Sequence, residues 1–218
     1  MEIVFVFDKN YIPYFKKCIK SVLKYNPKAH ITIVTNEELG LPYDTIKVTN
    51  LPKGLKHRRN DRITDATYLK LYLPKLLPYD KILYMDADII CQGSLEELWN
   101  EECDFICLTE SHNYGKIQAQ ELKHEKYGLS GVMLMNLEEL RKADFTKKCF
   151  QSFGCPVKKW CHEETLINFF FYKRLKFIDK KYNYCHNRTY DNPIPESEAV
   201  LLHYCGKNNK EEMLERRI

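Results

Sequence analysis

The first 35 residues alternate between a strand-like and a helix-like pattern of hydrophobic positions. A run of β-branched and aromatic residues at 3–7 predicts a strand, and a similar run at 31–34 predicts a second one. Between them, apolar residues recur at helical spacing. Pro13 suits the first turn of this helix, and Asn26, which is followed by a proline, ends it. Strand, helix and strand at this spacing predict a βαβ unit with a parallel sheet and a right-handed crossover.

The same alternation continues along the chain without a repeat or a linker. Residues 81–85 are continuously apolar, which indicates a central parallel strand that is buried on both faces. Ser94 and Glu97 have the spacing of a capping box, and Pro74 is expected at a kink or boundary of its helix. Other strands are expected at 45–48, 104–108, 131–135, 176–178 and 200–204, and helices at 66–77, 94–99, 136–142 and 163–172, with a loop and some helix over 110–127. This order predicts one α/β domain over residues 1–218.

Composition and charge exclude several classes of protein. The chain has 218 residues, of which 44% are hydrophobic and 29% charged, as in globular rather than disordered proteins. Its net charge of +4 is too small to indicate nucleic acid or a membrane as a partner. The start of the chain, with Glu2 and a short apolar run, does not resemble a signal peptide, and no apolar stretch approaches the ~20 residues of a membrane-spanning helix. We therefore expect a cytoplasmic protein with reduced cysteines.

Two carboxylates follow the predicted central strand, because Asp86 and Asp88 are separated only by Ala87. Open α/β sheets bind ligands at the carboxyl ends of their strands, and a turn with this spacing can direct both carboxylates at one Mg²⁺ or Mn²⁺. Asp-x-Asp is a common pattern, but two unpaired carboxylates beside a buried strand would be costly without a cation. His203 follows another apolar run and is either a further ligand or a structural histidine.

The sequence around these carboxylates resembles glycosyltransferase family 8, which contains bacterial lipopolysaccharide galactosyl- and glucosyltransferases and the glycogenins. The resemblance is carried first by one stretch that comprises residues 66–78 and 80–88. Further segments resemble the family in the same order along the chain: 7–11, 130–137, 163–168 and 203–207. Five landmarks in the right order are more specific than any one of them.

The resemblance implies a GT-A fold, a Rossmann-like nucleotide-sugar-binding fold with a mainly parallel sheet, and a transferase that retains anomeric configuration. Asp86, Asp88 and His203 would hold Mn²⁺, with Mg²⁺ as an alternative. Glu163, which stands where the family has an Asp that binds donor-sugar hydroxyls, and Glu164 would be the catalytic carboxylates. The residues that would bind a UDP-sugar donor are Phe7, Asp8, Asn10, Tyr11, Lys70, Asp86, Ala87, Ser130, Gly206 and Lys207.

The chain departs from the family pattern at several positions near the expected donor sugar. Leu129 replaces an Asn, and Lys70 replaces an Arg and so loses bidentate geometry. Residues 163–165 are Glu-Glu-Thr instead of Asp-Gln-Asp, so Glu164 puts a carboxylate where the family has an amide; we expect it on the β-face of the anomeric carbon. Asn209 stands where the family has a later Lys. These changes bear on the choice of donor rather than on the fold.

We therefore predict a Mn²⁺-dependent retaining hexosyltransferase. It would transfer a hexose from UDP-galactose or UDP-glucose to a saccharide or glycolipid acceptor of a surface glycan such as lipopolysaccharide. Two alternatives remain open: a nucleotide-sugar-binding relative that has lost catalysis, and a glycogenin-like primer that glucosylates itself. The landmarks fill residues 5–207, which leaves little chain for a membrane-binding tail. Either attachment at the inner face of the membrane is weak and peripheral, or a membrane-binding tail lies outside this sequence.

Other patterns give weaker indications. The basic segment 53–62 is either a solvated loop or a contact for phosphate or acceptor groups. A nucleic-acid partner is not expected, because the rest of the chain has no matching stripe of charge. Two groups could suggest zinc, namely Cys155 with Cys161 and His162, and Cys185 with His186. Their spacings fit no common zinc site, so we interpret these cysteines as buried or incidental thiols. The two tryptophans and the three phenylalanines at 169–171 are expected in the core.

Overall fold

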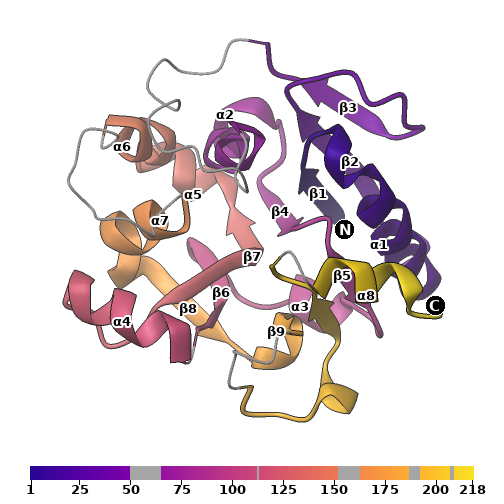
Figure 1. Ribbon diagram of the computed structural model, residues 1–218. Helices are drawn as coiled ribbons and strands as arrows, with labels where there is room; N and C mark the ends of the chain where they lie inside the picture. Colours follow the sequence, from indigo (N-terminus) through magenta and orange to yellow (C-terminus); the bar gives the residue numbers. More distant parts are fainter. Residues whose placement is uncertain (50–64, 112, 152–162, 187–191, 207–208) are drawn as a thin grey trace.

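The computed structural model describes residues 1–49, 65–111, 113–151, 163–186, 192–206 and 209–218 (Figure 1). The strands are β1 (Glu2–Val6), β2 (His30–Thr35), β3 (Asp44–Lys47), β4 (Lys81–Met85), β5 (Ile89–Cys91), β6 (Ile106–Glu110), β7 (Gly128–Asn136), β8 (Leu175–Ile178), β9 (Tyr184–Cys185) and β10 (Leu201–His203). The α-helices are α1 (Ile12–Tyr25), α2 (Leu73–Leu76), α3 (Glu96–Trp99), α4 (Asn113–Leu122), α5 (Leu137–Lys142), α6 (Phe145–Gln151), α7 (Glu163–Phe171) and α8 (Asn209–Glu215).

A seven-stranded sheet with the order β3-β2-β1-β4-β7-β6-β8 forms the centre of the molecule. It is mainly parallel: β7 runs antiparallel to both of its neighbours, and the other paired strands are parallel. The strand order reverses between β1 and β4, which pair directly with Phe5 opposite Met85. Ligands of open α/β sheets bind where the order reverses, outside the carboxyl ends of the strands. The sheet thus places the ends of β1 and β4 side by side.

The hydrophobic core lies on both faces of this sheet. In β1, Ile3 and Phe5 pack on one face with α1 and α8, whereas Val4 and Val6 pack on the other face with α5, α6 and α7. Figure 1 shows the two groups of helices on opposite sides of the sheet. All residues of β4 after Lys81 are buried, as predicted from its continuous apolarity. This two-sided cover gives the α/β architecture that was expected from the sequence.

A second, three-stranded sheet with the order β5-β10-β9 lies beside the first. Strand β5 begins directly after Asp88, and β10 pairs antiparallel to it with His203 opposite Ile89. The backbone N–H of Tyr204 also donates a hydrogen bond to the carbonyl of Asp88, at 2.9 Å. This pairing brings the histidine, more than a hundred residues away in sequence, next to the two aspartates.

Most predicted elements are confirmed, and several boundaries differ. Residues 66–77, predicted as one helix, form a 3₁₀ helix (Asp65–Tyr72) followed by α2, in whose first turn Pro74 lies. The predicted capping box at α3 is wrong. The Ser94 hydroxyl accepts a hydrogen bond from the N–H of Glu96 instead of that of Glu97, and the Glu97 carboxylate binds Lys181. The structure also contains β5, β9, α6 and α8, which the hydrophobic pattern did not predict.

The side chains expected in the core divide into three kinds. Phe171 is buried and Trp99 packs at the edge of the core, as predicted. The prediction for Phe169 is wrong, because its side chain is 41% exposed. Trp160 and the cysteines 155 and 161 lie outside the described residues, as does the basic segment 53–62. None of the described helices has the length and unbroken apolar sequence that a bilayer-spanning segment requires.

Candidate active site

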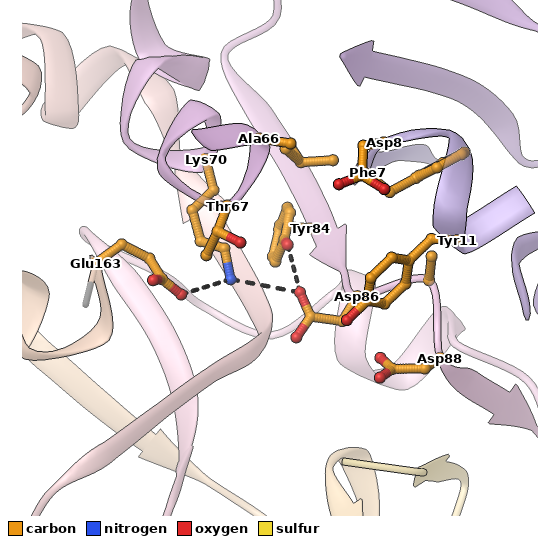
Figure 2. A pocket seen from close by; sticks show the side chains of 12 residues that line it. Phe7, Asp8, Tyr11, Ala66, Thr67, Lys70, Tyr84, Asp86, Asp88 and Glu163 are labelled. Atoms are coloured by element: carbon orange, nitrogen blue, oxygen red, sulfur yellow. Dashed lines mark hydrogen bonds and ion pairs between the residues drawn. The ribbon is translucent and has the colours of Figure 1, made fainter. Parts of the chain in front are cut away.

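A pocket opens at the carboxyl ends of β1 and β4, where the strand order reverses (Figure 2). It is lined from four parts of the chain: the end of β1, the 3₁₀ helix over 65–72, the end of β4 with the turn after it, and the start of α7. The lining residues are Val6, Phe7, Asp8, Tyr11, Ala66, Thr67, Lys70, Tyr84, Asp86, Ala87, Asp88 and Glu163. Most of the residues that were predicted to bind a donor are therefore together in one place.

The turn after β1 shapes one side of the pocket. Asp8 is buried, and its carboxylate accepts a hydrogen bond of 2.9 Å from the N–H of Asn10, which caps the 3₁₀ helix Lys9–Tyr11. This turn directs Phe7, Asp8 and Tyr11 at the pocket (Figure 2). Asn10, in contrast, is exposed and is not part of the lining.

A buried ion-pair network forms the opposite side. The Lys70 ammonium lies 2.9 Å from Oε1 of Glu163 and 3.4 Å from Oδ1 of Asp86, between the two carboxylates (Figure 2). The hydroxyl of Tyr84 donates a hydrogen bond to the same oxygen of Asp86. Burial alone would lower the pKa of Lys70, but the two carboxylates raise it well above its usual value. Lys70 is thus a charged side chain in the protein interior.

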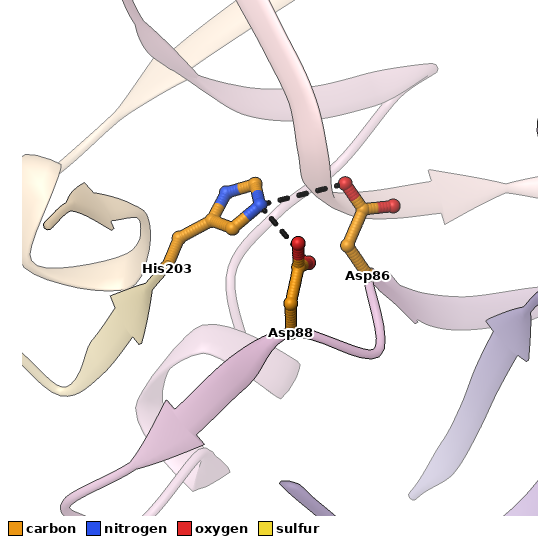
Figure 3. A group of neighbouring side chains, drawn as sticks. All are labelled: Asp86, Asp88 and His203. Carbon is orange, nitrogen blue, oxygen red and sulfur yellow. Dashed lines mark ion pairs between the residues drawn. The ribbon is translucent and has the colours of Figure 1, made fainter. Parts of the chain in front are cut away.

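Asp86 and Asp88, which line the pocket, come together with His203, which is not part of the lining (Figure 3). Nε2 of His203 lies 3.3 Å from Oδ1 of Asp88 and 3.7 Å from Oδ2 of Asp86, and one potential ligand atom from each residue lies within 4.8 Å of the others. Two carboxylates and an imidazole are a donor set that suits a divalent cation such as Mn²⁺. Among the described residues, this is the one group of three or more His, Cys, Asp or Glu with such spacing.

Gly131 in β7 makes room for this group. A Cβ atom at position 131 would lie 2.5 Å from Cε1 and 2.7 Å from Nδ1 of His203, and 3.2 Å from Oδ2 of Asp86. The carbonyl of Gly131 also accepts the N–H of Asp86, at 2.8 Å. Any side chain at this position would therefore push the histidine and the aspartate apart.

Positive side chains compensate Asp88. Besides His203, the Lys210 ammonium lies 3.0 Å from Oδ2 of Asp88, and it also donates a hydrogen bond to the Tyr11 hydroxyl. Burial would raise the pKa of Asp88, but His203 and Lys210 lower it far below its usual range. Burial would likewise lower the pKa of His203, but Asp88 raises it to about 9. Three positive side chains thus face the two aspartates: Lys70 at Asp86, and His203 and Lys210 at Asp88.

Two adjacent carboxylates come from the start of α7: Glu163 lines the pocket, and Glu164 follows it in the helix but is not among the lining residues. The N–H of Ser130 donates to Oε2 of Glu164 at 2.8 Å, and the Ser130 hydroxyl lies within 3.3 Å of both Glu163 and Glu164. Burial raises the pKa of Glu164 to about 7, and the neighbouring charge of Glu163 adds to the effect. Oε2 of Glu163 is buried and has no hydrogen-bond partner among the described residues. It is therefore an acceptor that a bound hydroxyl could satisfy.

The remaining predicted residues lie elsewhere. Gly206 is exposed with φ of 92° and lies outside the pocket lining, and Lys207 falls outside the described residues. Two residues at the site were not assigned from the sequence: Lys210, which stands one position after the Asn that replaces a family Lys, and Asn183, whose Oδ1 lies 2.9 Å from Nδ1 of His203. No sequence signal would have identified Asn183.

Comparisons with known proteins agree with this geometry. The model of glycosyl transferase family 8 matches residues 2–210. The lipopolysaccharide 1,3-galactosyltransferase of Salmonella typhimurium is 27% identical over 242 residues, which cover 94% of this chain and 71% of that protein. The lipopolysaccharide 1,2-glucosyltransferase of Escherichia coli is 31% identical over 153 residues, which cover 58% of this chain and 43% of the relative.

The fold is also similar to that of solved structures. The galactosyltransferase LgtC, crystallised in complex with donor and acceptor sugar analogues, superposes with a TM-score of 0.80. The match covers 99% of this chain and 94% of the other, at 21% sequence identity. The GT-A arrangement expected from the sequence is therefore confirmed.

Proposed function

This chain belongs to glycosyltransferase family 8, and we propose that it is a retaining hexosyltransferase whose residues 1–218 act as one catalytic domain. The donor would be UDP-galactose or UDP-glucose, and the acceptor a saccharide or glycolipid of a surface glycan such as lipopolysaccharide. The observation that carries this proposal is the group of Asp86, Asp88 and His203, the last two of them buried, beside a pocket at the sheet's reversal point. A nucleoside diphosphate carries dense negative charge, and a divalent cation held by this group would offset it.

In this proposal, Asp86, Asp88 and His203 hold Mn²⁺, with Mg²⁺ as the alternative. Their donor set fits either cation, and one potential ligand atom from each of the three lies within 4.8 Å of the others. When bound, the cation supplies positive charge that stabilises the diphosphate as it leaves the sugar. His203 must then present Nε2 without its proton, because this nitrogen faces both aspartates.

The nucleoside would occupy the side of the pocket formed by the turn after β1. Asp8 and Asn10 would form hydrogen bonds with uracil and ribose. The Tyr11 ring would lie against the base. Asp8 is already in place, because its backbone turn is capped by its own carboxylate. Gly206, Lys207 and Lys210 would meet the diphosphate, since Lys210 already binds Asp88 at this end of the pocket.

The hexose would lie between Lys70 and the two carboxylates of α7. The unpaired Oε2 of Glu163 supports a role in accepting a sugar hydroxyl. Ser130 holds Glu164 through its backbone N–H, so the position of this carboxylate is fixed before the donor binds. An oxocarbenium-like transition state gains from a nearby negative charge, and we assign this role to Glu164.

Glu164→Gln tests the catalytic assignment. Gln can still accept the N–H of Ser130, so the structure is preserved while the negative charge is lost. If Glu164 stabilises the transition state or attacks the anomeric carbon, kcat should fall by roughly two orders of magnitude or more, with little change in KM. Full turnover in the Gln variant would contradict both roles.

The acceptor class rests on the relatives, which act on lipopolysaccharide according to their names. An acceptor of this kind is assembled at a membrane. Since none of the described helices can span a bilayer, we propose a cytoplasmic enzyme with at most weak peripheral attachment to the inner face.

A panel of UDP-sugars tests the whole proposal. Binding and slow hydrolysis of each sugar are measured with and without Mn²⁺, for the wild type and for Asp88→Ala. We expect one UDP-hexose to be hydrolysed only with the cation, and the variant to lose this activity. A catalytically inactive relative would bind UDP but release no sugar, and a self-glucosylating primer would gain mass in steps of one hexose. If no UDP-sugar binds and Asp88→Ala changes nothing, the proposal fails.

A further inference from the structure

We propose that Asn183 sets the tautomer of His203 and so prepares its imidazole to bind a divalent cation. Oδ1 of Asn183 lies 2.9 Å from Nδ1 of His203, and both side chains are buried, with Asn183 fully so. The inference rests on the proposed cation site and extends it to a residue outside the group of three ligands. Asn183 is accordingly a positioning residue, which acts through His203.

The argument begins with the single proton of a neutral imidazole. This proton is either on Nδ1 or on Nε2, and only the nitrogen that lacks it can bind a cation. Nε2 of His203 faces Asp88 at 3.3 Å and Asp86 at 3.7 Å. Both carboxylates attract the proton to Nε2, where it would block the cation. A competing acceptor on the other side of the ring is needed to keep the proton on Nδ1.

Asn183 provides this acceptor. Its Oδ1 faces Nδ1 of His203, and the His203 ring is the sole hydrogen-bond partner of the Asn183 side chain among the described residues, because Nδ2 is buried without one. Buried amide groups are normally hydrogen-bonded at both ends. An amide that leaves its nitrogen unpaired and turns its oxygen to His203 is therefore placed for the histidine rather than for its own hydrogen bonding.

The backbone keeps the pair in register. The 3₁₀ helix Lys180–Tyr182 ends at Asn183, whose N–H donates to the carbonyl of Lys180 at 3.0 Å. Strand β9 follows at once and pairs with β10, with Cys185 opposite His203, and the N–H of His186 donates to the carbonyl of His203 at 2.8 Å. Asn183 and His203 thus come from paired segments whose separation is fixed by the small sheet.

Three variants test the inference through their affinity for Mn²⁺, measured from the electron paramagnetic resonance signal of the free ion. Asn183→Ala removes the acceptor, and we expect Mn²⁺ affinity to fall by roughly 10- to 100-fold. Asn183→Asp is isosteric, and its carboxylate can only accept, so we expect affinity equal to or tighter than that of the wild type. Asn192→Ala is the control. The Asn192 side chain also binds β9, because its Nδ2 donates a hydrogen bond of 2.9 Å to the carbonyl of Cys185, but it does not contact His203. We expect it to bind within twofold of the wild type.

A second readout does not involve the cation. Long-range ¹H–¹⁵N spectra of the metal-free protein at alkaline pH, where the imidazole is neutral, show which ring nitrogen carries the proton. We expect a larger share of the proton on Nδ1 in the wild type and in Asn192→Ala than in Asn183→Ala, where it should shift toward Nε2. A role of Asn183 in stability alone would not move this signal.

The outcomes separate this inference from the proposed function. Wild-type affinity for Mn²⁺ and an unchanged tautomer in Asn183→Ala would overturn the inference and leave the proposed function standing. Weaker binding in Asn183→Asp than in the wild type would show that the amide donates rather than accepts, and would also overturn it. A wild type that binds neither Mn²⁺ nor Mg²⁺ would overturn both. If Asn183→Ala does not fold, the isosteric Asp variant still decides.

Discussion

Lys210 forms an ion pair of 3.0 Å with Asp88, a residue that lines the pocket, and the same ammonium binds the hydroxyl of Tyr11. One lysine of α8 thereby connects a proposed cation ligand with the ring that is expected to contact uracil. The Lys210 ammonium also lies over the Tyr11 ring, with Nζ 4.0 Å from the ring centre.

Lys210→Met separates the two roles of this lysine. The variant loses a positive charge that would meet the diphosphate, so we expect UDP affinity to fall about tenfold, as for one charge-assisted hydrogen bond. Mn²⁺ affinity without nucleotide should be equal or higher, because Asp88 loses a competing cation. Isothermal titration calorimetry measures both. Lys16→Met, an exposed lysine of α1, is the control, and equal losses of UDP and Mn²⁺ affinity would contradict the prediction.

Lys70→Met should destabilise the fold. It leaves Glu163 and Asp86 without their shared cation in the interior, and removing one partner of a buried ion pair costs about 3–5 kcal/mol. Thermal and denaturant unfolding measure the loss. Lys75→Met changes an exposed lysine of α2 and should have almost no effect. If the two variants are equally stable, the buried network contributes nothing to the fold.

Gly131→Ala should abolish cation binding while preserving the fold. The new methyl group would overlap the ring of His203 and come within 3.2 Å of Asp86, so the ligands must separate. We expect a loss of Mn²⁺ affinity of at least tenfold. Gly93→Ala provides the matched control, because a Cβ there would lie 3.6 Å from the nearest atom of Val200, which is an ordinary contact. Tight Mn²⁺ binding by Gly131→Ala would show that the three side chains do not form the site.

Glu164 should make the stability of the protein depend on pH. Its pKa is about 7 in the folded chain, against ~4.3 for an ordinary Glu in the unfolded chain. The folded state therefore binds this proton more tightly, and the stabilisation is complete below pH ~4.3 and lost as pH rises through about 7. Such a difference corresponds to roughly 3–4 kcal/mol.

Glu164→Gln removes this dependence. Relative to the wild type, its free energy of unfolding should increase by roughly that amount between pH 4.5 and pH 8, as measured by urea unfolding at several pH values. Glu138→Gln, which alters an exposed carboxylate, is the control. A difference between Glu164→Gln and the wild type that stays constant with pH would refute the assignment of the raised pKa.

Much of the fold could be predicted because its signals are local. The unbroken apolar run of β4 identified a central strand, and the position of Asp86 at its end identified the site. The helix over 66–77 was misjudged because periodicity does not separate a 3₁₀ helix from an α-helix over eight residues. Phe169 was misplaced because an apolar helix such as α7 can still present one side chain to solvent.

The parts of the site that escaped prediction depend on tertiary contacts. The family resemblance identified His203, but Asn183 reaches it only through the pairing of β9 with β10. Short strands such as β9, with two residues, carry no periodicity. Lys210 lies in a helix that was not predicted, and nothing local indicates that its ammonium reaches Asp88.

The pairing of β10 with β5 has a consequence for the energetics of donor binding. Asp86 follows β4 of the large sheet, Asp88 precedes β5 of the small one, and His203 ends β10, the central strand of the small sheet. A cation held by all three would cross-link two sheets that are otherwise hydrogen-bonded separately. Occupancy of the site would then slow amide exchange throughout β5, β9 and β10, so the small sheet would report on the ligand although most of it never touches the donor.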